Sequence, residues 1–387
     1  MRINSQIKQS PTLKFAMAAR ERIAKGENII SLGLGEPEFD VPKEIIESTT
    51  EILVTKKSGY SSPLGLPDLK NKIAQKLSQE NGIPCKANNI LISAGAKQAY
   101  QMVVSALLLP NDEVIVINPS FVSFVPQLLI AEPDCKIINV DVNKTDFSLP
   151  IEQIEKVITS KTKLLVVNSP NNPGGYMLSE QQLTELFSLA EKHDFYILSD
   201  EIYEKLQFAD RKHFSIGSLE KNEIKRVITI NGYSKSHAMT GWRLGYACFP
   251  KEMQENLLKL QMHINTNTCT FIQEGVANAK NVDLSYLNLY NEKLRERISW
   301  YSEMIGRLPN ITSVIPQGGF FAFMNISQLS LDSNTFCSQL IEETGVATTP
   351  GLAFGENWDD HVRISFATDD EVVKRGLELI EKFIKSL

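Results

Sequence analysis

Four short apolar runs in the sequence are each followed by polar residues that could do chemistry. The last of these stretches contains an isolated lysine, Lys235, with an arginine, Arg243, eight positions later. Parallel strands place their carboxyl ends along one edge of a sheet, so residues that follow such strands can converge on one ligand. The four stretches are AGAKQ (94–98), NSPNNPGG (168–175), Asp200 with Tyr203, and NGYSKSHAMTGWRLGY (231–246).

Each stretch has an ordinary explanation when it is considered alone. AGAKQ fits a tight turn and NSPNNPGG fits an irregular loop, because small residues, asparagine and proline are typical of turns. Asp200 fits the cap of a following helix. Most lysines lie on the solvated surface, and Lys235 taken by itself would be assigned there. No single stretch therefore assigns a function.

The four stretches together make a consistent set of chemical groups. A helix start with free backbone N–H groups binds phosphate. A lysine amine such as that of Lys235 forms a Schiff base with an aldehyde. A carboxylate such as Asp200 beside a pyridine nitrogen keeps that ring protonated, which makes the ring an electron sink. Pyridoxal phosphate carries both the phosphate and the aldehyde, so the set predicts a site for this cofactor.

The elements that must position these groups alternate between short β-rich runs and helical patterns. Ser179 precedes apolar residues at helical spacing, which predicts a helix over 179–193. Strands that are nearly all apolar and separated by helices are typical of a parallel sheet covered on both faces. We therefore predict an α/β protein with a mainly parallel sheet. The runs read as its strands are 89–93, 113–117, 136–140, 162–168, 195–200 and 226–230.

The chain is long enough for two domains. Its 387 residues exceed what one compact core usually holds. The pattern changes near 284, where a long charged helical run begins. We predict an N-terminal arm and part of a small domain over 1–44, a large cofactor-binding domain over 45–283, and a small C-terminal α/β domain over 284–387. The segment 31–42 is expected to return to the small domain.

Composition excludes several other classes of protein. The net charge is -6 and no basic stripe is present, so we expect no nucleic-acid partner. No apolar run approaches the length of a membrane span, and the N-terminus does not read as a signal peptide. The 5 cysteines are scattered, which predicts free thiols in the cytoplasm. The 5 histidines lack metal-ligand spacing, so we expect no metal site.

The sequence resembles the class I/II aminotransferases of the pyridoxal-phosphate fold type I group. Five motifs occur in the order expected for that family, and the resemblance covers nearly the whole chain. Within the family it is most similar to prokaryotic-type aspartate aminotransferases and their broad-specificity relatives. The resemblance implies a seven-stranded type of sheet with helices on both faces and a smaller α/β domain. The motifs are GYSSPLG (59–65), GAKQ (95–98), NSPNNP (168–173), SDEIY (199–203) and SKSHAMTGWRLG (234–245).

The resemblance also assigns roles to cofactor-binding residues. Lys235 matches the lysine that bonds to the cofactor aldehyde and carries the substrate proton. Asp200 matches the carboxylate at the ring nitrogen, and Phe121 matches the aromatic ring that stacks on the cofactor. Tyr203 and Asn172 match donors to the phenolic oxygen. The phosphate ligands implied are Arg243, Ser234, the backbone of Gly95, Ala96 and Lys97, and Tyr60 of a partner subunit, so the resemblance implies a homodimer with shared sites.

Substrate contacts follow from the resemblance in the same way. Arg363 matches the arginine that pairs with the α-carboxylate, and Gly35 lies in the loop that closes over it. Phe121 and Asn172 border the same space. Lys97 matches a lysine that some aspartate enzymes use for the side-chain carboxylate, although a surface lysine at a helix start remains the alternative.

Three positions depart from the pattern. Many family members have tryptophan at Phe121, threonine at Gly174, and some have a phosphate-binding serine at Gly232. The aromatic ring is kept at the first position, but a hydroxyl is lost at each of the others. Ser234 is then the nearest hydroxyl to the lysine.

The expected reaction is ping-pong transamination between an L-amino acid, favoured as aspartate or glutamate, and a 2-oxo acid such as 2-oxoglutarate. Lyases, decarboxylases, synthases and broad-specificity biosynthetic aminotransferases use the same residues and remain alternatives. A nicotinamide oxidoreductase is disfavoured, because the glycine-rich stretch at Gly33 lacks a third glycine and a helix start. A DNA-binding regulator is disfavoured because no helix-turn-helix segment is apparent.

Overall fold

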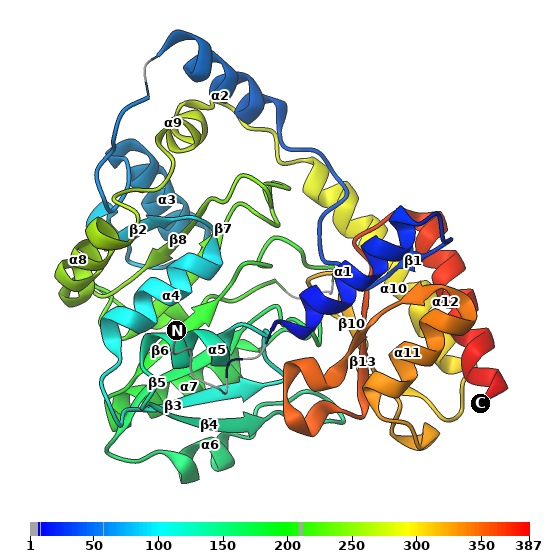
Figure 1. Cartoon of the computed structure of the whole chain (residues 1–387). Helices are drawn as coiled ribbons and strands as arrows, with labels where there is room; N and C mark the ends of the chain where they lie inside the picture. Colours follow the sequence, from blue (N-terminus) through cyan, green and yellow to red (C-terminus); the bar gives the residue numbers. More distant parts are fainter. Residues whose placement is uncertain (1–6, 8, 57, 209–211) are drawn as a thin grey trace.

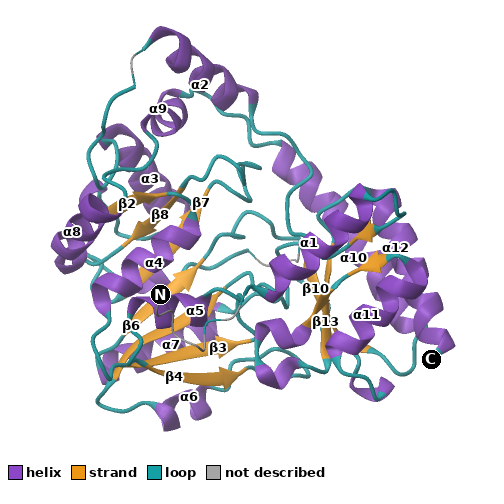
Figure 2. Ribbon diagram, in the orientation of Figure 1, coloured by secondary structure: helices purple, strands orange, loops and turns teal. Residues whose placement is uncertain are grey.

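The computed structural model describes residues 7, 9–56, 58–208 and 212–387. A large sheet with its helices forms one part of the molecule, and a smaller group of strands and helices lies beside it (Figure 1; Figure 2). The last helix lies in the smaller part. Within the described residues, no helix combines the length and apolar character needed to cross a bilayer.

The large sheet has seven strands in the order β2-β8-β7-β6-β5-β3-β4. Every neighbouring pair is parallel except the two pairs that involve β8, which runs antiparallel to β2 and to β7. The predicted mainly parallel, seven-stranded sheet is therefore confirmed. Its strands are β2 (Ile90–Ser93), β3 (Glu113–Asn118), β4 (Lys136–Asp141), β5 (Thr162–Asn168), β6 (Tyr196–Asp200), β7 (Val227–Gly232) and β8 (Gly245–Cys248).

Helices cover both faces of this sheet because its strands are apolar on both sides. Alternate side chains of a strand point to opposite faces. Val114 of β3 packs in one buried cluster with α4 residues, whereas Ile115 packs in another with α7 residues. The same alternation holds for Leu164 and Leu165 of β5. The helices of this part include α3 (Pro67–Glu80), α4 (Ala96–Leu107), α5 (Phe124–Ala131), α6 (Ile151–Val157), α7 (Glu180–His193) and α8 (Gln254–Ile264).

The start of α7 follows the sequence prediction. The Ser179 hydroxyl accepts a hydrogen bond from the backbone N–H of Gln182, and the Gln182 side chain accepts one from the Ser179 N–H. This reciprocal capping box satisfies two backbone donors that a helix start would otherwise leave unpaired.

The smaller part is built on a four-stranded antiparallel sheet in the order β12-β13-β10-β9. Leu32, which follows β1, forms backbone hydrogen bonds with both Ala347 and Ser365, so this residue lies against the smaller part. The strands are β1 (Ile30–Ser31), β9 (Thr312–Ser313), β10 (Phe321–Asn325), β11 (Val346–Ala347), β12 (Thr349–Pro350) and β13 (His361–Ser365). The helices are α1 (Pro11–Ala24), α10 (Tyr286–Gly306), α11 (Ser333–Thr344) and α12 (Asp370–Ser386).

Two further helices project away from the sheets. α2 (Lys43–Thr55) packs against α9 (Thr270–Asn278), and the pair lies at the top of Figure 1. Their contact is close, because a Cβ at Gly275 of α9 would lie 2.0 Å from the Thr49 hydroxyl of α2.

Polar contacts at the end of β4 join the two parts. The Asp141 carboxylate accepts one hydrogen bond from the Trp358 indole at 2.7 Å and another from the Asn357 amide at 2.6 Å. Lys144 forms an ion pair with Asp360 at 2.7 Å nearby. These contacts hold the smaller sheet against the carboxyl ends of the large-sheet strands, where the candidate functional residues lie.

Candidate active site

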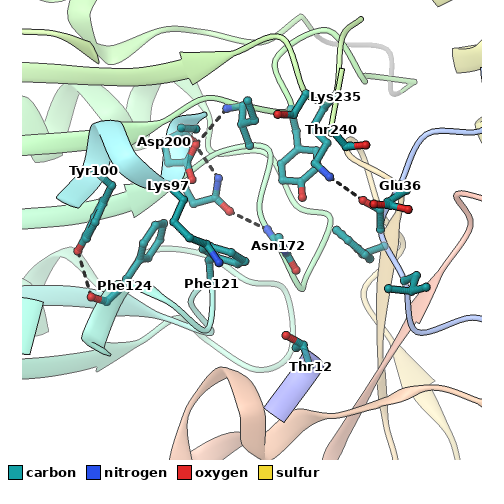
Figure 3. Close-up of a pocket in the computed structure, with 18 of the residues that line it drawn as sticks. Thr12, Glu36, Lys97, Tyr100, Phe121, Phe124, Asn172, Asp200, Lys235 and Thr240 are labelled. Carbon is teal, nitrogen blue, oxygen red and sulfur yellow. Dashed lines mark hydrogen bonds between the residues drawn. The ribbon is translucent and has the colours of Figure 1, made fainter. Parts of the chain in front are cut away.

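A cavity of about 380 Å³ lies where the carboxyl ends of the large sheet meet the smaller part. Figure 3 shows Lys235, Asp200, Asn172, Lys97 and Phe121 around it. Eleven residues expected from the sequence therefore share one cavity with residues from the N-terminal segment. The predicted residues that line it are Gly35, Ala96, Lys97, Phe121, Asn172, Asp200, Tyr203, Ser234, Lys235, Arg243 and Arg363.

Lys235 lies in the turn that follows β7 and reaches across the cavity. Its Nζ donates a hydrogen bond to the Gly35 carbonyl oxygen at 2.6 Å and lies 5.4 Å from the centre of the Phe320 ring. Burial lowers the pKa of Lys235 to about 8, and Glu36 opposes that shift. Burial disfavours the ammonium form, so the amine is closer to its reactive neutral state than a surface lysine.

Asp200 is the last residue of β6, and its position is fixed by backbone and side-chain contacts. Its Oδ1 accepts from the Ile202 N–H at 3.2 Å, and its carbonyl oxygen accepts from the Asn168 amide at 2.8 Å. Burial raises the pKa of Asp200 to about 7, with the Glu201 charge acting in the same direction. Among the described residues no cation is hydrogen-bonded to this carboxylate. A protonated ring nitrogen would supply the missing charge partner.

Arg363 of β13 extends from the smaller sheet toward Asn172 and Gly33. Its Nη1 donates to the Asn172 Oδ1 at 2.9 Å and its Nη2 donates to the Gly33 carbonyl at 2.7 Å. The buried Nε has no hydrogen-bond partner in the described part of the chain. The guanidinium lies 4.2 Å from the centre of the Phe321 ring, and burial lowers the pKa of Arg363 to about 10. The site thus contains a buried cation with unused donor capacity.

Tyr203 and Asn172 lie close to the same group of residues. Burial raises the pKa of the Tyr203 phenol, so it stays a hydrogen-bond donor at neutral pH. The Asn172 backbone N–H donates to the Asn168 Oδ1 at 2.8 Å, which fixes the loop after β5. The prediction that these two side chains face one ligand is consistent with their shared position in the cavity lining.

The start of α4 and the residues before β8 form a compact group. Gly95 has φ +84°, and a Cβ there would lie 2.4 Å from the Arg243 Nη2. Arg243 donates to the Thr240 carbonyl at 2.7 Å. A Cβ at Gly245 would lie 2.4 Å from the backbone nitrogen of Ala96. The glycines therefore let the arginine and the helix start approach each other closely, which suits an anion.

Lys97 and Ser234 also have polar groups directed at the cavity. The Lys97 Nζ lies 5.4 Å from the centre of the Phe121 ring, and its pKa is lowered by burial and by Arg243. The Ser234 hydroxyl makes no hydrogen bond to any residue in the described ranges, although Ser234 lines the cavity. Both groups remain available to a ligand.

Tyr60 does not reach the cavity of its own chain. Its side chain is 90% exposed and it does not line the site. Gly95 is also absent from the lining, because it lies beneath Arg243.

The structure gives physical reasons for two departures from the family pattern. A Cβ at Gly174 would lie 2.7 Å from the Tyr176 ring, and a Cβ at Gly232 would lie 2.9 Å from the Leu244 carbonyl. Neither position has room for a larger side chain without a shift of its neighbour.

Sequence reasoning missed other residues that line the cavity. Thr12 comes from the N-terminal arm, Glu36 from the loop after β1, and Tyr100 and Gln127 from two helices. Gln127 donates to the Lys97 carbonyl at 2.8 Å and so supports the start of α4. Glu36 lies within the segment 31–42, next to Gly35, and this position in the sequence was the signal that could have identified it as a cavity residue.

Comparisons with known proteins agree with this geometry. The family model described as "Aminotransferase class I and II" matches residues 27–380. The chain is 37% identical over 369 residues to an aspartate aminotransferase of Pyrococcus abyssi, covering 94% of each chain. It is 36% identical to aromatic-amino-acid aminotransferase 2 of Thermococcus litoralis, again covering 94% of each.

A solved structure extends the agreement to three dimensions. Aspartate aminotransferase from Thermus thermophilus with maleate has a TM-score of 0.92 to this chain. The two are 34% identical, and the match covers 99% of this chain and 100% of the other. The cavity, the strand ends that surround it and these matches along nearly the full length lead to one conclusion: the chain belongs to the class I and II aminotransferases.

Proposed function

We propose that this aminotransferase uses pyridoxal phosphate to move an amino group from an L-amino acid to a 2-oxo acid such as 2-oxoglutarate in a ping-pong reaction. One observation carries the proposal: Lys235, Asp200 and Arg363 line a single cavity although they come from distant parts of the chain. They supply an amine, a carboxylate and a guanidinium, which are the groups that this reaction needs.

The residues present fit the cofactor. The close approach of Gly95, Ala96 and Arg243 leaves backbone N–H groups and a guanidinium for a phosphate. Asp200 is buried without a hydrogen-bonded cation among the described residues, which suits a pyridinium nitrogen. Tyr203 and Asn172 line the same cavity and would donate to its phenolic oxygen, and Phe121 would stack on its ring. When bound, the cofactor supplies the electron sink that stabilises negative charge on the substrate carbon.

The residues of the chain would then perform the remaining steps. The neutral amine of Lys235 takes the proton from the substrate α-carbon and returns it on the cofactor side, as general base and then general acid. A pKa of about 8 suits both roles near neutral pH. Arg363 forms a bidentate pair with the substrate α-carboxylate and so fixes its orientation. The loop at Gly35 covers that carboxylate and excludes water.

We further propose the division into domains given above, with the small domain (1–44 and 284–387) closing on the large one (45–283). Arg363 lies on a strand of the smaller sheet, whereas Lys235 and Asp200 follow strands of the large one. Relative movement of the two parts would therefore change the distance between the carboxylate-binding and proton-transfer groups.

An acidic amino donor, aspartate or glutamate, is our favoured substrate. The relatives include both aspartate and aromatic-amino-acid aminotransferases, so membership of the family does not by itself identify the amino donor. The Lys97 ammonium supports the acidic side chain, because it lines the cavity without an ion-pair partner in the described part of the chain. The start of a helix disfavours a cation, and an acidic ligand would offset that cost.

A cytoplasmic homodimer with shared sites is the form that we propose. Tyr60 is 90% exposed, and Val54 and Leu53 nearby are 77% and 56% exposed. Exposed apolar side chains that lie close in sequence to an exposed aromatic residue suit an isologous interface. Tyr60 would then contact the phosphate in the partner's cavity.

The half-reaction tests the proposed chemistry. Adding an amino acid to the holoenzyme should bleach the cofactor's visible absorption, and adding a 2-oxo acid should restore it. A lyase or synthase would release product without that reversible change. Lys235→Ala should abolish turnover, and a variant that kept near-normal rates would refute the assignment.

A mixing experiment tests the shared sites. Lys235→Ala and Tyr60→Ala are each expected to be impaired. Hybrid dimers contain one doubly altered site and one intact site, so activity should rise on mixing. No gain after confirmed subunit exchange would contradict the shared-site dimer.

A further inference from the structure

A buried polar cluster lies on the reverse side of the strand end that carries Asp200. Glu201 is 1% exposed, and both of its carboxylate oxygens are hydrogen-bonded. Oε1 accepts from the Ser199 hydroxyl at 3.0 Å, and Oε2 accepts from the Ser215 hydroxyl at 2.6 Å. The His213 Nε2 lies 3.1 Å from the same Oε2. This carboxylate is thus fully enclosed and takes no part in lining the cavity.

The cluster continues to α3 through a second buried carboxylate. Glu204 accepts from Asn81 at 2.6 Å and forms an ion pair with Lys76. The Asn81 amide also donates to the Ser215 hydroxyl at 2.7 Å. The two carboxylates and His213 lie close enough to hold a metal ion. Lys76 already pairs with Glu204, and serine hydroxyls and His213 already bond Glu201, so the donors are in use within the protein.

Charge balance gives the cluster an electrostatic role. Glu201 and Glu204 bring two buried negative charges, and Lys76 brings one positive charge. Lys76 balances Glu204, whereas the Glu201 carboxylate is stabilised by the Ser199 and Ser215 hydroxyls and the adjacent His213 ring, since a buried charge must be paired or hydrogen-bonded. The titratable groups that face Glu201 are Asp200 and Glu204 on its own segment, Lys76 from α3, His213 from the following loop, and Tyr246 and Cys248 from β8.

The backbone connects this cluster directly to the cavity. Glu201 directly follows Asp200, the last residue of β6, and its carboxylate bonds to Ser199, the residue before Asp200. Adjacent residues of a strand point to opposite sides, so Ser199 and Asp200 face opposite ways. The Glu201 N–H donates to the Ile230 carbonyl of β7 at 2.9 Å, and its carbonyl accepts from the Glu204 N–H at 2.9 Å. Tyr203 lies inside that turn. The cluster therefore holds both Asp200 and Tyr203 from behind.

We infer that Glu201 is a positioning residue, which fixes the strand end bearing Asp200 and Tyr203 and sets the negative potential behind Asp200. The inference rests on the proposed cofactor, because Asp200 acts through the ring nitrogen. A negative charge at Glu201 stabilises positive charge on the cofactor, and the positive charge of Lys76 in the same cluster limits that effect.

Opposite charge changes should therefore have opposite effects. In holoenzyme with pyridoxal phosphate, Glu201→Gln removes a negative charge. The pH at which the cofactor's visible absorption changes should fall by roughly one pH unit. Lys76→Gln removes the positive charge that is paired with Glu204 in the same cluster and should raise the same midpoint. A role confined to fold stability would not reverse the sign between the two variants.

Glu113→Gln is a matched control. Glu113 is also a buried carboxylate, 5% exposed, bonded to the Thr159 hydroxyl at 2.6 Å and to Lys136 at 2.9 Å. It begins β3, at the end of the sheet away from the cavity. Its variant should lose stability without moving the midpoint. Cofactor affinity, measured by equilibrium titration, should fall at least about fivefold in Glu201→Gln and stay unchanged in the control.

Three results would overturn the inference. They are an unchanged midpoint in Glu201→Gln, shifts of the same sign in both variants, or an equal shift in Glu113→Gln. If Glu201→Gln does not fold, Lys76→Gln decides, since an unshifted midpoint there refutes the electrostatic role of the cluster. Failure of the proposed function is distinct, because the unaltered protein would then show no reversible spectral half-reaction.

Discussion

The ammonium nitrogen of Lys235 lies 2.6 Å from the carbonyl oxygen of Gly35, and the hydrogen bond joins residues 200 positions apart. It connects the turn after β7 with the loop after β1. One partner belongs to the large sheet and the other to the segment that lies against the smaller part. The amine is therefore held in the centre of the cavity, where burial controls its protonation.

The lowered pKa of Lys235 predicts how fast the cofactor-free protein captures pyridoxal phosphate. Only the neutral amine attacks an aldehyde. Because the pKa is lowered to about 8, the neutral fraction grows through that pH and is nearly complete well below the usual lysine range. Initial rates, followed by absorbance from pH 6 to pH 10, should rise and level off just above about pH 8. Free lysine amine is the control, and a rate for the protein that kept rising to pH 10 would contradict the burial effect.

Lys97→Gln tests how the donor is chosen. Losing one charge-assisted contact should lower kcat/KM for aspartate or glutamate by about 10- to 100-fold. Rates with phenylalanine should change little. Lys163→Gln is the control, because the Lys163 Nζ lies 5.2 Å from the Tyr196 ring centre, a contact like that of Lys97 with Phe121 but away from the cavity. Equal losses of kcat/KM for acidic and aromatic donors would show that Lys97 does not recognise the substrate side chain.

Arg363→Lys should weaken substrate binding while leaving the fold intact. Lysine keeps the charge but cannot form two parallel hydrogen bonds to a carboxylate. We expect KM for every amino donor to rise about 10- to 100-fold, with a smaller change in kcat. Steady-state kinetics would measure this. Arg375→Lys on α12, where the arginine is exposed and pairs with Glu378, should be neutral. If KM rose for some amino donors and not for others, Arg363 would contact the substrate side chain instead of the α-carboxylate.

Gly245→Ala should reduce both stability and cofactor affinity. The added methyl carbon would lie 2.4 Å from the Ala96 nitrogen and 2.4 Å from the Gly95 carbonyl carbon, and backbone atoms cannot move aside easily. We expect a loss of about 1–3 kcal/mol in the free energy of unfolding, together with weaker phosphate binding. Gly241→Ala is the control, since nothing lies within 4 Å of its added carbon. Denaturant titration and cofactor titration measure the two effects, and a neutral Gly245→Ala would show that this contact is not tight.

The residues at parallel strand ends were the most predictable part of the site. Asp200, Asn172 and Lys235 follow runs whose apolar character indicates buried strands, and such strands end along one edge. The start of α7 was equally predictable from the sequence, because Ser179 and Gln182 cap it within four residues. In both cases local sequence contains the physical cause.

Other features depended on contacts between distant segments. β8 has only four residues and lies antiparallel in a mostly parallel sheet. It was not predicted as a strand, because its first residues overlap the motif that contains Lys235. Thr12, Gln127 and the Glu201–His213 pair are positioned by packing between segments, which spacing along the chain does not encode. Tyr60 remains a prediction, since its role depends on a partner.

The lack of space above Gly245 also determines how β8 aligns with its neighbours. Gly245 pairs with Ser93 of β2 and with Gly232 of β7. Hydrogen bonds alone would permit β8 to slide along these strands, but a shift that placed Leu244 or Tyr246 at this point would bring a side chain against the start of α4. Steric exclusion thus selects a single register, and that register sets where Arg243 lies.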